Sequence, residues 1–201
     1  GNVRLMYSPL SVLEWAKAEP DKIFYVTAVG FETTLPIYAL MMEDIVSQGI
    51  QNIRFLTSIK ALMPALFWLC ENDAAIDGFL GPGHVSAILG EDVYLPLCHQ
   101  YQIPLAIAGF GFEQIVAAIY DLMTQCKAGT HEVHNLYKNV VSKPGNTEAL
   151  ALIDKYFVKT PSLWRGLGSI GKSGYRLAPE YERYDAGDWE QGADLREPAG
   201  C

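Results

Sequence analysis

Polar residues that could do chemistry follow apolar runs at three places in the chain. Glu32, Thr33 and Thr34 come after "KIFYVTAVG", His84 comes after "AAIDGFLGPG", and Glu113 comes after "IPLAIAGFGF". A carboxylate or an imidazole can transfer a proton, and threonine hydroxyls can hold a polar ligand. The three segments lack the glycine and lysine spacing of a P-loop, and "GFGFEQI" lacks the third glycine of a dinucleotide fingerprint. If these residues have a chemical role, it is therefore proton transfer or the binding of a small polar ligand.

Each of these residues also has a simpler structural interpretation. Thr33 can cap a following helix, with Glu32 beside the positive helix end. His84 can donate a hydrogen bond to a carbonyl of its own Pro-Gly turn. For Glu32, Thr33 and Thr34 the residue types alone favour capping, and for His84 they favour neither interpretation over the other.

The elements that must position these residues alternate between β-rich runs and helical patterns. Strands are predicted at 3–8, 22–30, 53–57, 75–81 and 103–109, and helices at 9–19, 33–49, 58–72, 83–90 and 112–123. Gly49 is expected to end the second helix, and Ser58 to cap the third. The runs 23–29 and 105–108 are apolar throughout, which is typical of strands covered on both faces. This pattern predicts an α/β fold over residues 1–129, with a doubly wound, mainly parallel, Rossmann-like sheet.

In such a sheet, ligands bind at the carboxyl ends of the strands. We therefore expect Glu32, Thr33 and His84 to face one cleft, with Glu32, Thr33, Thr34 and His84 as the catalytic candidates. The glycines beside them would let a ligand or another backbone approach closely. The residues expected to line the cleft are Gly30, Phe31, Gly81, Pro82, Gly83, Val85, Ser86, Glu113 and Arg165.

Residues 130–201 have a different texture, and we expect a helical segment and an extended tail that packs back on a neighbouring domain. Two helices broken at Pro144-Gly145 are predicted, with Asn146 or Thr147 capping the second, followed by one or two strands. In "WRGLG", Arg165 could contact an anion. An ion pair beside an interface tryptophan is the preferred interpretation.

Composition excludes several classes of function. The chain has 201 residues, a formal net charge of −8 and a pI near 4.9, which argues against nonspecific nucleic-acid binding. No apolar run is long enough to span a bilayer, so a membrane protein is not expected. Cys70, Cys98, Cys126 and Cys201 form no C-x-x-C pair, and their wide spacing suits reduced thiols in the cytoplasm. Because the chain starts inside an apolar run without Met and stops on a cysteine, we expect it to be a fragment.

Several motifs together resemble one family. The segments "GFETT", "GFLGPGHVSAILG", "AGFGFEQI", "PGNTEALALI", "WRGLGSIGKSGYRLAPEYERYDA" and "EPAGC" occur in the order found in HypD, the family that helps to assemble the iron–cyanide–carbonyl group of [NiFe] hydrogenases. The resemblance covers essentially the whole chain. It implies two Rossmann-like domains around a cleft and a third region that holds a [4Fe–4S] cluster.

The resemblance also implies roles for particular residues. The family's GFETT and PGHVS stretches line the cleft, which makes Glu32 and His84 candidates for proton handling or for positioning cyanide and CO on iron. Cys201 matches the first cysteine of the cluster-binding series, and the remaining cluster cysteines would lie beyond it. Gln114 departs from the family pattern, in which proline commonly follows G-F-E.

Two hypotheses about function follow. The first is a scaffold and redox component of iron-ligand assembly that acts with HypC-like and HypE-like proteins, in which the 201 residues alone hold no cluster or iron tightly. The second is a stand-alone α/β enzyme or binding domain for a small anionic ligand such as a phosphate or carboxylate. In the first, His84 is a cleft residue and not a primary iron ligand.

Overall fold

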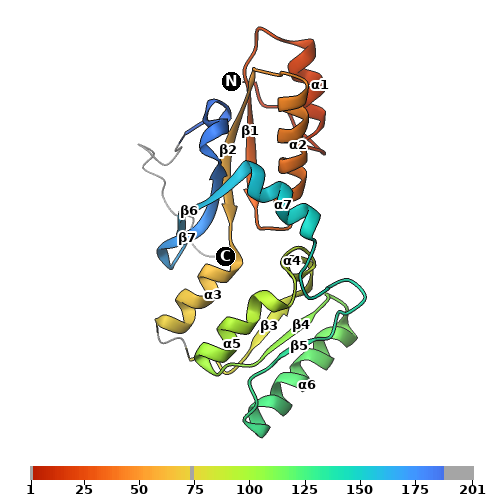
Figure 1. Cartoon of the computed structure of the whole chain (residues 1–201), viewed down its shortest axis with the longest axis vertical. Helices are drawn as coiled ribbons and strands as arrows, with labels where there is room; N and C mark the ends of the chain where they lie inside the picture. The colour runs from red at the N-terminus through yellow and green to blue at the C-terminus, as the bar shows by residue number, and fades with distance from the viewer. Residues whose placement is uncertain (1, 73–74, 188–201) are drawn as a thin grey trace.

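The described part of the chain forms two lobes, each built around its own sheet (Figure 1). The computed structural model describes residues 2–72 and 75–187. One sheet has the strand order β1-β2-β7-β6 and the other the order β3-β4-β5. The α/β class is confirmed, but the strands predicted to share one sheet are divided between two.

The upper lobe is a mixed sheet covered by helices. Strand β1 (Phe24–Gly30) lies parallel to β2 (Ile53–Lys60), and β7 (Gly168–Leu177) joins β2 antiparallel. The helices α1 (Ser11–Ala18) and α2 (Leu35–Ser47) lie beside β1 and β2, on the side of the sheet where α7 (Thr147–Tyr156) also lies (Figure 1).

Strand β1 is not covered on both faces, contrary to the prediction. Val26 and Ala28 are buried in the core, whereas Tyr25 and Val29, on the other face, are 66% and 61% exposed. The apolar run at 23–29 therefore does not show whether other elements cover both faces of the strand or only one. Apolar side chains on both faces of β1 satisfy the pattern although helices cover only one of them.

The lower lobe is fully parallel in its described part. The strands β3 (Phe79–Pro82), β4 (Leu105–Ala108) and β5 (Val133–Asn135) pair in that order. Every residue of β4 is buried, which confirms the prediction for this strand. The surrounding helices are α3 (Leu62–Glu71), α4 (Gly83–Leu89), α5 (Leu95–Tyr101) and α6 (Phe112–Ala128), with a 3-10 turn η1 (Asp92–Tyr94) before α5.

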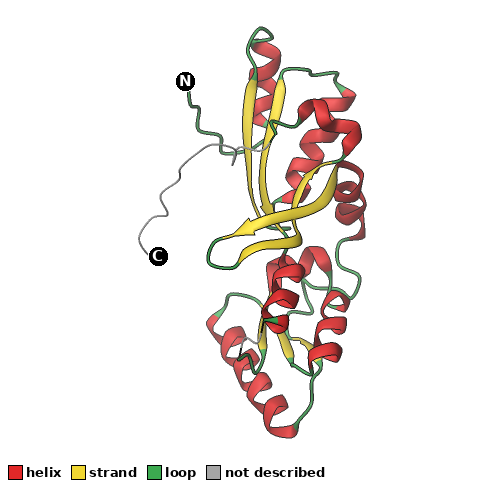
Figure 2. Ribbon diagram, turned by 90° about the vertical axis from the view of Figure 1, so that its left-hand side faces the viewer, coloured by secondary structure: helices red, strands yellow, loops and turns green. Residues whose placement is uncertain are grey.

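The chain crosses between the lobes twice. It leaves the upper sheet through α3 and returns through α7 into the hairpin of β6 (Phe157–Trp164) and β7, which projects beside the junction and is followed by a 3-10 turn η2 (Pro179–Tyr184) (Figure 2). The predicted division into 1–129 and 130–201 stays a prediction. The sheets do not follow it, because β5 pairs with β4 whereas β6 and β7 belong to the upper sheet.

Several local predictions can be compared directly with these elements. Gly49 has a φ of 67° just after α2, and Ile50 N–H donates to the Ile45 carbonyl, as expected for a glycine-terminated helix. Asn146 caps α7 by accepting a 3.0 Å hydrogen bond from Ala149 N–H. Both of these predictions are confirmed.

Other local predictions are wrong. Residues 3–8 form no strand, and residues 131–141 form β5 and turns instead of a helix. Ser58 lies inside β2 and does not cap a helix, since α3 begins at Leu62. Residues 53–60 and 133–135 pair with strands that are distant in sequence, whereas residues 3–8 pair with no described strand. In each case the pairing, or its absence, outweighed the local preference of the residues. Within the described ranges no helix is both long and apolar enough to cross a membrane.

Candidate functional site at the lobe junction

The turn between β1 and α2 carries the first group of predicted site residues. Gly30 has a φ of 145°, and a Cβ added there would lie 2.4 Å from Thr34 Oγ1. Thr34, and not Thr33, occupies the N-cap position of α2, and its hydroxyl donates a 2.9 Å hydrogen bond to the Phe31 carbonyl. Thr33 is exposed. The prediction of Thr33 as the cap is therefore wrong, and its hydroxyl faces solvent.

Glu32 is only 2% exposed and points toward another helix. Its Oε1 atom accepts a 2.8 Å hydrogen bond from the N–H of Leu62, the first residue of α3. Ala61, at the N-cap position of α3, has no side chain that could accept this bond. Glu32 thus satisfies one of the free N–H groups at the start of α3, the helix by which the chain leaves the upper sheet.

The second carboxylate oxygen of Glu32 is buried and has no hydrogen-bond partner among residues 2–72 and 75–187. Burial raises the pKa of Glu32 above its ordinary value, while its own backbone N–H, the Leu62 N–H and the charge of Lys159 act in the opposite direction. A buried carboxylate with one unpaired oxygen is costly, whereas the protonated acid is much less so. The surroundings therefore make Glu32 easier to protonate than a carboxyl group in water.

The turn from β3 into α4 carries the second group. The Ser86 hydroxyl donates a 2.9 Å hydrogen bond to the Pro82 carbonyl, so the 2.8 Å contact between Ser86 Oγ and Tyr94 Oη has Tyr94 as the donor. Ser86 and Tyr94 are fully buried. Tyr94 therefore holds the first turn of α4 in place through Ser86.

Tyr94 also connects the two groups. Burial raises the pKa of Tyr94 to about 12, and the negative charge of Glu32 contributes to the rise. Glu32, from the upper sheet, and the Ser86–Tyr94 pair, from the lower lobe, are therefore close enough to interact electrostatically. Tyr94 was not singled out from the sequence, because "GEDVYLPL" contains no recognisable motif.

His84 lies on the surface of the lower lobe. Its ring packs edge-on against Phe110, with the ring centres 4.8 Å apart. The neighbouring Gly83 has no room for a side chain, because an added Cβ would lie 2.5 Å from the Ala108 carbonyl oxygen and 2.6 Å from the Tyr137 ring. The glycine of this turn therefore accommodates a neighbouring strand and a side chain.

The structure brings some of the predicted residues together and leaves others apart. Glu32 lies within electrostatic range of Tyr94, the hydrogen-bond partner of Ser86, whereas no hydrogen bond among the described residues joins Thr33 or His84 to Glu32. Buried residues of the predicted cleft set are Gly81, Gly83, Val85 and Ser86; Pro82 and Thr34 are half-buried, and Phe31, Glu113 and Arg165 are exposed. A cleft shared by Glu32, Thr33 and His84 stays a prediction.

The β6–β7 hairpin packs against the β1–α2 turn. The Trp164 ring meets the Phe31 ring edge-on at 6.0 Å, and Trp164 Nε1 donates a 2.8 Å hydrogen bond to Ser173 Oγ. Arg165 lies in the turn of this hairpin. Trp164 therefore serves as the packing residue that the sequence suggested.

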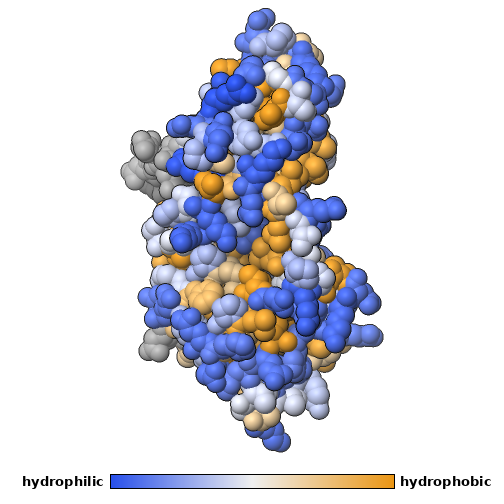
Figure 3. Space-filling model, viewed as in Figure 1, coloured by the Kyte–Doolittle hydropathy of each residue, from blue (hydrophilic) through white to orange (hydrophobic). Residues whose placement is uncertain are grey.

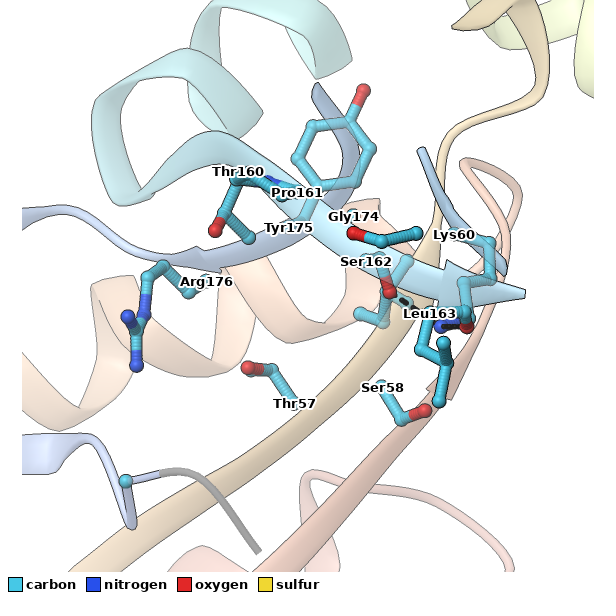
Figure 4. Close-up of a pocket in the computed structure, with 13 residues that line it drawn as sticks. Thr57, Ser58, Lys60, Thr160, Pro161, Ser162, Leu163, Gly174, Tyr175 and Arg176 are labelled. Carbon is cyan, nitrogen blue, oxygen red and sulfur yellow. Dashed lines mark hydrogen bonds between the residues drawn. The ribbon is translucent and has the colours of Figure 1, made fainter. Parts of the chain in front are cut away.

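A cavity of about 360 Å³ lies on the upper sheet between β2 and the hairpin (Figure 4). Lys60 reaches across it, donating to the Ser162 hydroxyl and, at 2.7 Å, to the Leu163 carbonyl. Arg176 Nε lies 3.5 Å from an Asp185 carboxylate oxygen. The other polar side chains that line the cavity are Thr57, Ser58, Thr160 and Ser169. The sequence did not reveal this cavity, since its walls come from strands about a hundred residues apart.

The described side chains do not fit a resident metal centre. In residues 2–72 and 75–187, no three His, Cys, Asp or Glu side chains lie close enough together to hold a metal ion. Burial raises the pKa of Cys98 to about 11, which disfavours the thiolate that binds metals. Cys201, the predicted cluster ligand, lies outside the described residues.

Comparison with known proteins places these residues in a family context. The model of the family described as "HypD: Hydrogenase formation hypA family" matches residues 1–201. The chain is 37% identical over 187 residues to hydrogenase maturation factor HypD of Escherichia coli, covering 92% of this chain and 50% of the relative. It is 37% identical over 191 residues to the HypD of Azotobacter vinelandii, with the same coverage. It is 34% identical over 208 residues to the HypD of Rhodobacter capsulatus, covering 100% of this chain and 55% of the relative. The chain thus spans about half the length of these relatives.

Proposed function

This chain belongs to the HypD family, and on that premise we propose that it acts in hydrogenase maturation. Its part in the process is to form the junction between two α/β lobes where the GFETT and PGHVS segments meet. The observation that carries the proposal is the 2.8 Å hydrogen bond from Leu62 N–H to Glu32, which ties the GFETT segment to the start of α3, the helix that leads into the lower lobe. In that lobe the buried Ser86–Tyr94 pair fixes the PGHVS segment.

The chemistry of this region is proton handling. Glu32 is a buried acid with a raised pKa and one unpaired oxygen, so it can hold a proton that a carboxylate in water would release. His84 lies at the surface end of the same α4 turn that Tyr94 holds in place, where it can contact a substrate or a partner. In this proposal Glu32 stores a proton and His84 positions the incoming group.

The metal chemistry is assigned to residues outside the described ranges. We propose that the chain works with HypC-like and HypE-like proteins as a scaffold and redox component for the Fe(CN)2CO group, and that Cys201 contributes to a [4Fe–4S] cluster. The described residues supply no metal site, so no step at the metal is assigned to them.

A complementation experiment tests the proposal. The segment of the Escherichia coli HypD gene that matches this chain is replaced by the sequence of this chain, and the hybrid is expressed in a host that lacks its own HypD-family gene. Hydrogenase activity is measured beside expression level, with the hybrid that carries the unchanged sequence of this chain as the wild type. We expect activity to be restored by the wild type and strongly reduced by Glu32→Ala and His84→Ala at equal protein level. A wild type that folds and accumulates but restores no activity would contradict the proposal and favour a stand-alone enzyme or anion-binding domain.

A further inference from the structure

A row of four paired residues crosses the upper sheet beside Glu32. The strand register pairs Gly30 with Ile59, Ile59 with Tyr175 and Tyr175 with Lys159, so the row runs over β1, β2, β7 and β6. Residues paired in this way lie on the same face of a sheet. Ile59 and Tyr175 are buried in the core of the upper lobe, so the row lies on the face that the helices cover.

The carboxyl group of Glu32 lies close to the middle of this row. It accepts its hydrogen bond from Leu62 N–H, just after the end of β2. The preceding Ala61 N–H donates a 2.8 Å hydrogen bond to the carbonyl of Ser173, on β7. The carboxyl group therefore lies where β2 ends against β7, two residues along β7 from Tyr175.

Tyr175 stands between Glu32 and Lys159. It is 7% exposed, and Figure 4 shows its ring and the Arg176 side chain on opposite sides of β7. Burial, and after it the charge of Glu32, raises the pKa of Tyr175, so the phenol stays neutral near neutral pH. A buried ring screens a nearby charge less than water does. Apolar side chains also reach the surface between the lobes (Figure 3), which reduces the access of water further.

Lys159 is the charged member of the row. The titratable side chains that interact with Glu32 from the elements packed around it are Tyr94 on η1, Tyr175 on β7 and Lys159 on β6, while Asp154 on α7 acts on Tyr175. Both tyrosines are neutral because their pKa values are raised. Lys159 is exposed, and it takes part in none of the ion pairs within residues 2–72 and 75–187. Its ammonium charge is therefore not balanced by a carboxylate of its own.

The hairpin fixes the distance between Lys159 and Glu32. Strand β6 is the last strand of the upper sheet and pairs with β7. Strand β7 pairs with β2 at the row itself and at the adjacent pair of Lys60 and Gly174. The row thus crosses the sheet at the place where the hairpin is joined to it. A shift of the hairpin along β2 would change the distance from the ammonium to the carboxyl group.

We propose that Lys159 is a positioning residue for the proton of Glu32, in which the ammonium group on β6 favours the carboxylate and, together with burial, sets the pH at which Glu32 takes up a proton. The inference rests on the proposed proton handling by Glu32. It adds that the β6–β7 hairpin takes part in it along with the GFETT segment. Lys159 touches no reacting group in this proposal and acts through Glu32.

A carbon-13 NMR titration of the glutamate carboxyl carbons tests the proposal on the purified protein. The Glu32 resonance is assigned by its loss in Glu32→Gln. We expect the pKa of Glu32 to rise in Lys159→Gln, to rise further in Lys159→Glu, and to keep its wild-type value in Lys159→Arg, which retains the charge. Lys172→Gln is the matched control, because Lys172 is exposed on the same hairpin and lies outside the row. It should leave the pKa unchanged.

Salt gives a second readout that a merely structural role of Lys159 would not produce. At about 1 M salt the Debye length falls to about 3 Å, so the field of an exposed ammonium group is largely screened. The pKa of Glu32 should therefore rise with salt in the wild type and much less in Lys159→Gln. An unchanged amide spectrum shows that each variant has kept the fold.

Two results would overturn the inference. The first is an unchanged pKa of Glu32 in folded Lys159→Gln. The second is an equal shift in Lys172→Gln, which would mean that net charge alone moves the pKa.

Hydrogenase activity of the hybrid protein judges the proposed function separately. Activity should fall in Lys159→Gln and return in Lys159→Arg at equal protein level. A shifted pKa with full activity would support the action of Lys159 on Glu32 and count against proton handling in maturation.

Discussion

Glu32 and Leu62 lie 30 residues apart, yet the carboxylate of one accepts a 2.8 Å hydrogen bond from the backbone N–H of the other. This bond ties the turn after β1 to the start of α3, where the chain leaves the upper lobe for the lower one. The acid of the GFETT segment therefore has a structural partner as well as a proposed chemical role. Substitutions can separate the two roles, because only one of them requires a group that ionises.

Glu32→Gln should change how stability depends on pH. A carboxyl whose pKa is raised on folding contributes stability fully below its unfolded pKa near 4.5, and this contribution is lost as pH rises through the folded pKa. Gln keeps the acceptor for Leu62 N–H but cannot ionise, so the variant should lose less stability than the wild type between pH 4.5 and neutral pH. The measurement is the thermal midpoint across this range.

Glu32→Ala is the companion variant. It removes the acceptor and leaves a buried N–H unsatisfied, which should cost about 1–3 kcal/mol of unfolding free energy. Equal pH profiles in the wild type and Glu32→Gln would contradict a raised pKa. No loss of stability in Glu32→Ala would contradict the cap on α3.

His84→Ala should lower hydrogenase maturation with little change in stability. His84 is exposed and its described ring contact is with Phe110, so the change in unfolding free energy should stay within about 0.5 kcal/mol. Thermal midpoint and hydrogenase activation are measured side by side, with His99→Ala as the control because His99 is exposed on α5. A lowered midpoint with unchanged activation would make His84 a purely structural residue.

His134 should contribute stability at low pH that is lost as pH rises. Its Nδ1 lies 2.7 Å from an Asp121 carboxylate oxygen and its Nε2 lies 3.2 Å from Glu132, and the bond to Asp121 is the main cause of its raised pKa. This contribution is complete below the unfolded pKa near 6.5 and disappears as pH passes the folded pKa.

Chemical denaturation from pH 6 to 9 checks the His134 prediction by comparing His134→Gln with its parent. Because Glu32 changes stability in the same direction, both proteins should carry Glu32→Gln. The difference in stability between them should be largest at the acidic end of the range. A difference that stays constant with pH would mean that His134 does not gain a proton on folding.

Reconstitution tests where the metal chemistry resides. We expect the 201 residues, incubated anaerobically with iron and sulfide, to form no stoichiometric [4Fe–4S] cluster, since one cysteine of the expected series cannot supply four thiolate ligands. Iron and sulfide content and the visible absorption spectrum are measured on the desalted protein. A cluster band at full occupancy would mean that Cys70, Cys98 or Cys126 binds metal after rearrangement.

Family membership and the α/β class could be read from the sequence because they depend on local order. Short motifs in a fixed succession and alternating apolar and helical periods are properties of neighbouring residues. The glycine that ends α2 and the Asn146 cap of α7 were predictable for the same reason, since each bond lies within a few residues.

Tertiary structure alone decided how the strands were divided and what the site residues contact. Strand β2 pairs with β7, from more than a hundred residues later, and β7 pairs with β6, while β3, β4 and β5 form a separate sheet. The single predicted sheet is therefore two. The hydrogen bond of Glu32 to the start of α3 and the pairing of Tyr94 with Ser86 were not predicted, because no motif marks either contact. Such contacts are set by packing between segments far apart in the chain, and local residue preferences carry no information about that packing.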